Sequence, residues 1–159
     1  MINKDYILRL AERIGRELSI LLGLRERNEI EEGLITIDNL LIRSTGLTSR
    51  FINALSEDML VKSLSPFGRL NTEAFIWVAV LLKTEGILYE RLEQESESYY
   101  RYVKSLYLFL EVLQREPTLI ESQYMADIKE LLVKLEPYEL PATLTPKLVW
   151  YHEHLERGH

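Results

Sequence analysis

The chain has 159 residues, enough for one domain with its own hydrophobic core, and no cysteine, which excludes disulfide bonds, thiolate metal sites and cysteine nucleophiles. Its formal net charge is −6, and residues 1–70 hold ten of the 19 basic and ten of the 25 acidic residues, so the acidic excess belongs to the remainder. Because an acidic surface repels phosphate backbones, we expect no nucleic-acid partner.

Residues 3–43 predict a helix hairpin. Glycine and proline are few in the chain and fall between apolar segments, which favours an all-α fold. We expect a single domain over 1–159.

We expect the first helix of this hairpin to begin near Asn3, a capping residue, and to end near Arg25, with a turn near Asn28. A second helix follows from Ile30 to Arg43, with Gly33 at the closest approach of the two. The apolar residues of the first helix recur at helical spacing and are Ile7, Leu10, Ala11, Ile14, Leu18, Leu21 and Leu22.

Residues 47–64 predict two short connecting helices or one kinked helix. Ser44-Thr45-Gly46 ends the preceding helix, and Ser56 is a plausible internal cap because Glu57 and Asp58 follow it. The breaker Ser65-Pro66-Phe67-Gly68 closes this region.

Residues 72–116 predict a long central hairpin. The run Ala74 to Leu82 is apolar on every side, which indicates a core helix surrounded by neighbours. It extends to Leu92, and the polar stretch 94–98 indicates a turn. The second helix carries apolar residues from Tyr99 to Leu113 and ends before Pro117.

The same apolar run is the longest in the chain and is about half the length that a membrane span needs. Charged residues between Lys4 and Arg13 interrupt any signal-peptide core. We therefore expect a cytoplasmic protein with no membrane partner.

Residues 118–157 predict the C-terminal helices. The capping box from Thr118 to Glu121 begins a helix that continues to Pro137. Thr145-Pro146 pairs a cap with proline at the first helical position and begins the last helix. This helix has no following partner helix, so its apolar side either packs back on the two preceding helices or is covered by another chain.

Two segments resemble the second half of a tetratricopeptide repeat, a helical repeat of protein-interaction modules. In the first, turn, large, small and large residues follow at the spacing of that repeat, and in the second, small and large residues and an apolar pair precede its terminal proline. The first has Asn where the repeat usually has a turn glycine, and Leu40 where it usually has alanine. The resemblance implies antiparallel hairpins stacked as a tetratricopeptide-like array of about seven helices. The matching residues are Asn28, Ile30, Gly33, Ile37 and Leu40-Leu41, and then Ser105, Phe109, Val112-Leu113 and Pro117.

The whole chain also resembles an uncharacterised family of bacterial all-helical proteins with degenerate repeats of this kind. That family has no assigned function, so the resemblance implies the fold and no active site. It is carried by Lys4-Asp5-Tyr6-Ile7, Gly23-Leu24, Asp38-Asn39-Leu40-Leu41 and Tyr138-Glu139-Leu140-Pro141.

No catalytic motif is present in the sequence. There is no glycine-rich phosphate loop, nucleophile elbow or two-histidine zinc helix. His152 and Glu156 lie four apart but have no third ligand at recognisable spacing, and a solvated helix end is the favoured interpretation. Glu93, Glu95 and Glu97 lie in a predicted turn, where water keeps paired carboxylates from acid and base roles. We expect no enzyme activity, cofactor or metal.

The predicted function is a protein-interaction module with a protein or peptide partner. Tyr99, Tyr102 and Leu106 share the core face of their helix, whereas Tyr100, Lys104 and Tyr107 point elsewhere and are the candidate partner-binding residues. Two alternatives stay open. One is a self-associating homodimer formed through the last helix, and the other is a helical small-molecule sensor with a pocket inside the central hairpin.

Overall fold

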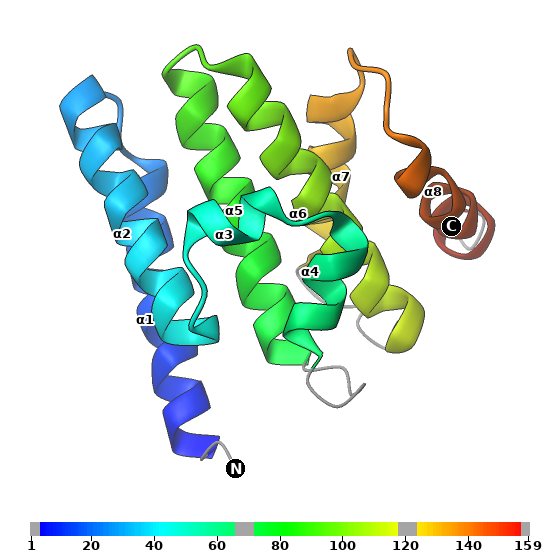
Figure 1. Cartoon of the computed structure of the whole chain (residues 1–159), viewed down its shortest axis with the longest axis horizontal. Coiled ribbons are helices and arrows are strands. Elements are labelled where there is room, and N and C mark those ends of the chain that lie inside the picture. The colour runs from blue at the N-terminus through cyan, green and yellow to red at the C-terminus, as the bar shows by residue number, and fades with distance from the viewer. Residues whose placement is uncertain (1–3, 66–71, 118–123, 157–159) are drawn as a thin grey trace.

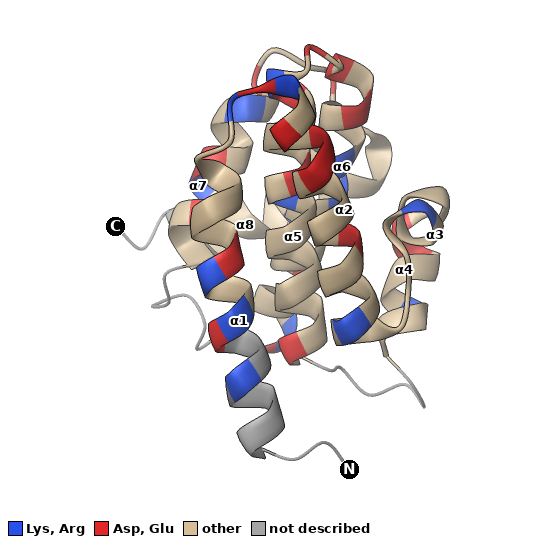
Figure 2. Cartoon of the chain, turned by 90° about the vertical axis from the view of Figure 1, so that its left-hand side faces the viewer, with Lys and Arg blue, Asp and Glu red and all other residues tan. Residues whose placement is uncertain are grey.

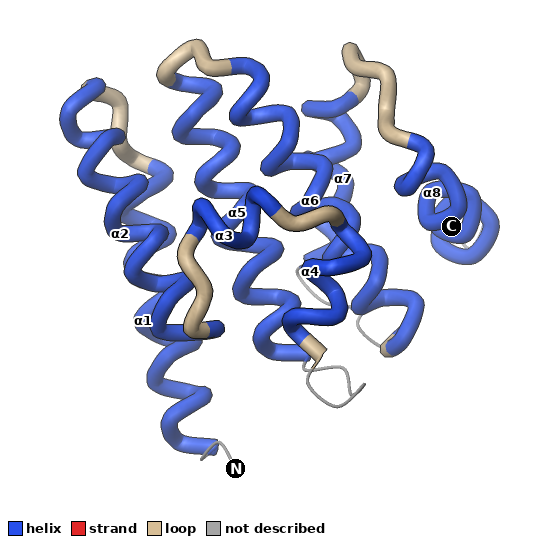
Figure 3. The backbone as a smooth tube through the Cα atoms, in the orientation of Figure 1, coloured by secondary structure: helices blue, strands red, loops and turns tan. Residues whose placement is uncertain are grey.

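The computed structural model describes residues 4–65, 72–117 and 124–156, and in the first helix the side chains of residue 9 and of residues from 12 onward. Within these residues the chain is all-α, and no strand is present (Figure 3). A 3₁₀ turn, η3 (Ala142–Leu144), precedes the last α-helix and a π-helical turn, η4 (His152–Glu156), follows it. The eight α-helices are α1 (Lys4–Leu22), α2 (Arg27–Thr45), α3 (Ser49–Ala54), α4 (Glu57–Leu64), α5 (Thr72–Arg91), α6 (Glu95–Arg115), α7 (Tyr124–Leu135) and α8 (Thr145–Tyr151).

The core is built around the central pair α5 and α6, which pack against each other along their length (Figure 1). Most of the apolar run in α5 is buried as predicted, because α1 and α2 also contact this helix, and Trp77 and Val80 are half-buried. Apolar surface removed from water contributes roughly 25 cal/mol per Å², and both helices bury most of their apolar residues. The turn between the two helices comprises residues 92–94, and α6 begins at Glu95, earlier than the predicted turn at 94–98 allowed.

Small residues bring α5 and α6 close together. Ser105 is fully buried, and its Oγ donates a hydrogen bond of 2.6 Å to the carbonyl oxygen of Ala79. A Cβ atom at Gly86 would lie 2.6 Å from the ring of Tyr102, so only glycine fits there. The two helices therefore meet at two points where any larger side chain forces them apart.

The first hairpin differs from prediction in the position of its turn. The turn spans residues 23–26, and Asn28 lies in the first turn of α2, so the predicted turn at Asn28 and the predicted end near Arg25 are wrong. Gly33 does lie at the closest approach, because a Cβ there would be 2.7 Å from Leu24 and 3.0 Å from Leu21. Helix α2 ends at Gly46 in the left-handed conformation, at φ 77°.

Helices α3 and α4 are the two short connecting helices. Thr48 caps α3 by accepting a hydrogen bond from the amide of Phe51, and Ser56 caps α4 by accepting one from Met59. The predicted cap at Ser56 is confirmed, and it splits residues 47–64 into two helices, which raises the count from about seven to eight. Figure 2 shows α3 and α4 on one side of the central pair, and α1 and α7 on the other.

The last helix packs back on the same chain. Helix α8 contacts α6, and the side chains of Leu144, Lys147, Tyr151 and Leu155 are buried. The sequence left open whether the apolar side of this helix packs on its own chain or on another chain, and in the structure it packs on its own chain. Pro146 is at the start of α8 as predicted, but Thr145 is a helical residue with no capping hydrogen bond. The predicted breaker at 66–68 and the capping box at 118–121 lie outside the described residues.

Candidate functional site

A groove of about 350 Å³ lies along α5, between α1 and α7. Its floor is the side of α5 that neither neighbour covers, and its walls come from one helix on each side. Leu22 at the rim of the groove is 40 % exposed. The residues that line it are Ile14, Gly15, Leu18 and Leu22 of α1, Ile76, Trp77, Val80, Lys83, Thr84 and Ile87 of α5, and Tyr124, Asp127 and Glu130 of α7.

Gly15 opens the α1 wall of this groove. A Cβ atom at this position would have no neighbour within 4 Å. Glycine inside a helix costs about 0.5–1 kcal/mol relative to alanine, and no contact within the chain requires it here. The glycine leaves room for an occupant to approach the backbone of α1 closely.

The polar end of the groove is formed by one buried lysine and two carboxylates. Nζ of Lys83 lies 2.7 Å from Asp127 and 2.6 Å from Glu130, and the lysine side chain is nearly inaccessible. The Glu130 side chain is about half exposed, at 48 %. Two carboxylates against one ammonium leave this end of the groove with a net negative charge.

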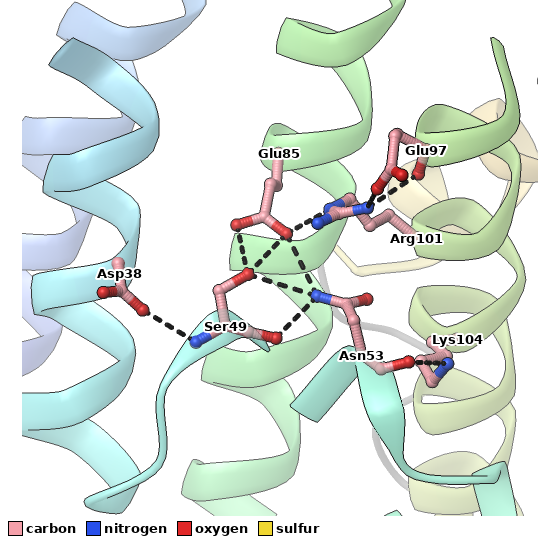
Figure 4. Close-up of polar contacts among 7 residues, drawn as sticks. All are labelled: Asp38, Ser49, Asn53, Glu85, Glu97, Arg101 and Lys104. Carbon is pink, nitrogen blue, oxygen red and sulfur yellow. Dashed lines mark hydrogen bonds and ion pairs between the residues drawn. The ribbon is translucent and has the colours of Figure 1, made fainter. Parts of the chain in front are cut away.

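A second polar cluster lies on the opposite side of α5 and joins four helices (Figure 4). Glu85 is only 2 % exposed and accepts hydrogen bonds from Ser49 of α3, at 2.7 and 2.9 Å, and from Asn53 Nδ2, at 3.3 Å. Nε of Arg101 on α6 also donates to Glu85. Asp38 on α2 accepts a hydrogen bond of 2.7 Å from the backbone amide of Ser49. The cluster borders an open hollow of about 750 Å³.

Arg101 is the cation that pairs with Glu85 and Glu97 in this cluster. Burial acts to lower the pKa of Arg101, but the charge of Glu85 and the hydrogen bonds that Arg101 donates to Glu85 and Glu97 outweigh it and raise the pKa. The guanidinium also donates to Glu97 at 2.6 Å and lies 4.3 Å from the ring centre of Tyr89. Glu85 thus accepts hydrogen bonds from three donor groups, which belong to Ser49, Asn53 and Arg101. Its geometry suits a structural task, which is to hold α3 against α2, α5 and α6.

The three predicted partner-binding residues occupy different environments. Tyr100 is 59 % exposed and lies on the surface. Lys104 is buried, and its Nζ donates a hydrogen bond of 3.0 Å to the carbonyl oxygen of Asn53. Burial lowers the pKa of Lys104. The ring of Tyr107 is partly covered by Lys147, whose Nζ lies 4.7 Å from the ring centre. The three lie four and three residues apart on α6, and their role in binding a partner stays a prediction.

Sequence reasoning missed Lys83, Glu85 and Arg101. All three lie in helices whose apolar pattern predicts a core, and each is buried there because its partner comes from a distant segment. A signal did exist: two charged residues, Lys83 and Glu85, interrupt the apolar sequence of α5 between Leu82 and Ile87.

Among the remaining candidates in the described part of the chain, Glu97 pairs with Arg101. Three or more His, Cys, Asp or Glu side chains do not gather there as a metal site would require. His154 stacks on Trp150, with ring centres 5.1 Å apart. None of the described helices is long and apolar enough to span a membrane.

Comparisons with protein-family models, with curated proteins and with solved structures yield no match for this chain. The predicted resemblance to a bacterial helical family is therefore still a prediction. What is established is an all-helical protein with a closely packed central helix pair, and no family is identified.

Proposed function

We propose that this protein is an interaction module that binds an apolar peptide segment or partner helix in the groove between α1, α5 and α7. The observation that carries the proposal is the groove itself, which has an apolar floor, an open glycine in one wall and a charged end. A helix that lays its apolar side into such a groove is a common mode of peptide recognition.

The order of the helices supports a tetratricopeptide-like arrangement. Helices α1 and α5 are the first members of two contacting pairs, with α2 and α6 as the second members, and α7 packs on α6 as the next helix in the stack. In stacked helix pairs each pair contacts its neighbours and leaves one face free along the stack. The groove lies on α1, α5 and α7, which is where such an array presents a binding face.

The side chains of the groove specify the chemistry of the partner. Leu18, Trp77, Val80 and Ile87 are partly exposed apolar residues, so they favour leucine-like or aromatic side chains on the partner. The excess carboxylate charge at Asp127 and Glu130 favours a lysine or arginine at the end of the partner segment. We therefore expect an amphipathic segment with one basic residue next to its apolar side.

A binding experiment with two groove variants tests this function. Gly15→Trp fills the open wall, and Glu130→Lys reverses the charge at the polar end. Both positions are accessible, so we expect both variants to fold. The matched control is Val133→Lys, which lies on the same helix as Glu130, is 66 % exposed and does not line the groove.

The readout is recovery of partner proteins from an extract of the source cells, followed by calorimetric titration with the recovered protein. The proposal requires that Gly15→Trp and Glu130→Lys each weaken binding at least tenfold while Val133→Lys binds as the unmodified chain does. Equal binding by all four proteins contradicts it.

A further inference from the structure

Three tyrosines gather around a small pocket at the end of the molecule opposite the chain's first helical turn. Tyr99 and Tyr100 come from the second turn of α6, and Tyr138 comes from the segment after α7. The ring centres of Tyr99 and Tyr100 lie 5.2 Å apart, and those of Tyr99 and Tyr138 lie 5.1 Å apart. The pocket has a volume of about 230 Å³ and is completed by Glu95, Ser96 and Glu139.

This tyrosine pocket is held in shape by a contact between distant segments. The hydroxyl of Tyr99 donates a hydrogen bond of 2.9 Å to the backbone carbonyl oxygen of Glu139, 40 residues away. Tyr100 and Tyr138 are both exposed although they are large aromatic residues. Their exposure is unusual, since burying such rings beneath neighbouring side chains stabilises a protein by about 1.5–3 kcal/mol each.

The electrostatic surroundings of the pocket are negative. Glu95 and Glu139 line it, and Glu93 and Glu97 lie beside it in sequence on the exposed surface. The nearby cations are paired with other carboxylates, Lys134 with Glu90 at 2.9 Å and Arg101 with Glu85 and Glu97. Figure 2 shows many acidic residues at the upper end of the molecule, which holds the turn between α5 and α6. The acidic first turn of α6 offsets the positive end of that helix.

A pocket lined by aromatic rings and carboxylates is suited to binding an organic cation. The face of a tyrosine ring attracts an ammonium group within about 6 Å, and several rings around one small space form the cages that bind alkylated ammonium groups. We propose that the tyrosine pocket binds an organic ammonium ion, with Tyr99, Tyr100 and Tyr138 as the aromatic walls and Glu95 and Glu139 as the counter-charges. This site is separate from the groove between α1, α5 and α7 and does not depend on the function proposed for it.

A titration monitored by NMR tests the ammonium site. The isotopically labelled full chain is titrated with choline and, in parallel, with 3,3-dimethylbutan-1-ol, which has the same shape but a carbon atom in place of the charged nitrogen. We expect choline to shift the amide signals of residues 95–100 and 138–139 in a saturable manner at millimolar concentration, and the alcohol to leave them unchanged. The ionic strength is held constant with sodium chloride.

Three variants locate the binding. Tyr100→Leu removes one aromatic wall and Glu95→Gln one charge, and each is expected to weaken choline binding about two- to five-fold. Phe51→Leu is the matched control, because Phe51 is an exposed aromatic residue on α3, away from the pocket. Circular dichroism checks that all three variants stay helical. The inference is overturned if choline and the alcohol shift the same signals equally, or if Tyr100→Leu binds choline as tightly as the unmodified chain.

The two sources of an ammonium group are separated by a second titration. A short peptide with one trimethyllysine is compared with the same peptide carrying norleucine. Tighter binding of the trimethyllysine peptide than of choline supports the site and indicates a side chain of a protein partner. Binding of choline alone supports it and indicates a free small molecule. Binding of neither compound overturns the inference.

Discussion

Gly15 and Gly86 are both inside helices, but they face different surroundings. A Cβ at Gly15 meets nothing within 4 Å, so Gly15→Ala is expected to raise the free energy of unfolding by about 0.5–1 kcal/mol through helix propensity alone. A Cβ at Gly86 would overlap the ring of Tyr102, so Gly86→Ala is expected to lower the free energy of unfolding by about 1–3 kcal/mol despite the same gain in propensity.

Urea unfolding followed by circular dichroism measures both changes on one scale. The two variants introduce the same methyl group into the same type of backbone, so each is the control for the other. An unchanged or increased stability of Gly86→Ala would show that α5 and α6 do not approach as closely as the structure has them.

Residue-scale predictions from the sequence succeeded where the cause is local. Ser56 caps α4 because its own backbone and the next three residues decide the geometry. Gly33 was recognised because two apolar helices a few residues apart must touch somewhere. Gly86 escaped notice because its partner is Tyr102, and only the length of the intervening turn determines which residue of α6 lies opposite it.

At the scale of elements, α3 is held by side chains rather than by its own length. Six residues are too few for a stable isolated helix. Glu85→Gln removes the charge that pairs with Arg101, and we expect the free energy of unfolding to fall by about 3 kcal/mol. We also expect faster hydrogen exchange at the amides of residues 49–54, because Glu85 accepts hydrogen bonds from two side chains of α3.

Asp38→Asn is the matched control for this variant. Asparagine keeps an oxygen that accepts the hydrogen bond from the Ser49 amide, so we expect little change in stability or exchange. Hydrogen exchange read by mass spectrometry compares α3 with α8 in the same sample. If Glu85→Gln leaves the exchange of α3 unaltered, the cluster does not hold this helix in place.

Helix α8 is attached by the buried side chain of Lys147. Its Nζ pairs with Glu111 on α6 and donates a hydrogen bond of 2.7 Å to Gln114. Burial acts to raise the pKa of Glu111, but the hydrogen bond and charge of Lys147, with those of Arg115, outweigh it and lower the pKa below its ordinary value of 4.5. A carboxyl group with a lowered folded-state pKa stabilises the fold above its unfolded-state pKa. That contribution is lost as the pH falls through the folded-state value.

We therefore expect the free energy of unfolding to decline below about pH 5, and the decline to be shallower in Glu111→Gln. Urea unfolding at several pH values between 7 and 3 gives both profiles. Glu29→Gln, which alters an exposed carboxylate of α2, should follow the unmodified chain. Parallel profiles for Glu111→Gln and the unmodified chain would mean that this carboxylate does not couple folding to protons.

The sequence predicted the approximate positions of the long helices, but it did not predict which charged side chains are buried. Apolar spacing predicted α2, α5 and α6 because a helix must bury a continuous face. The same pattern predicts that charged residues are exposed to solvent. However, Lys83, Glu85 and Lys147 are buried next to partners 16 to 47 residues away. The candidate groove was equally invisible, since it exists only where α1 and α7 stop short of each other across α5.

At the scale of the whole molecule, the covering of α8 by α6 bears on self-association. The buried residues of α8 pack on the same chain, so we expect no homodimer through the inner side of this helix. We expect sedimentation velocity to give the mass of one chain, 18.7 kDa, across the micromolar concentration range. A mass that rises toward twice that value with concentration would show that the chain forms a dimer.

The groove between α1, α5 and α7 is the central claim, and site-specific photo-crosslinking tests it most directly. A benzophenone amino acid replaces Leu22 at the groove rim or, as a control, Ile35 on the exposed side of α2. Each protein is irradiated in an extract of the source cells. We predict a discrete crosslinked partner from position 22 that is absent from position 35 and is lost when Gly15→Trp fills the groove. Equal products from both positions, or a product from position 22 that survives Gly15→Trp, would contradict the groove as the binding face.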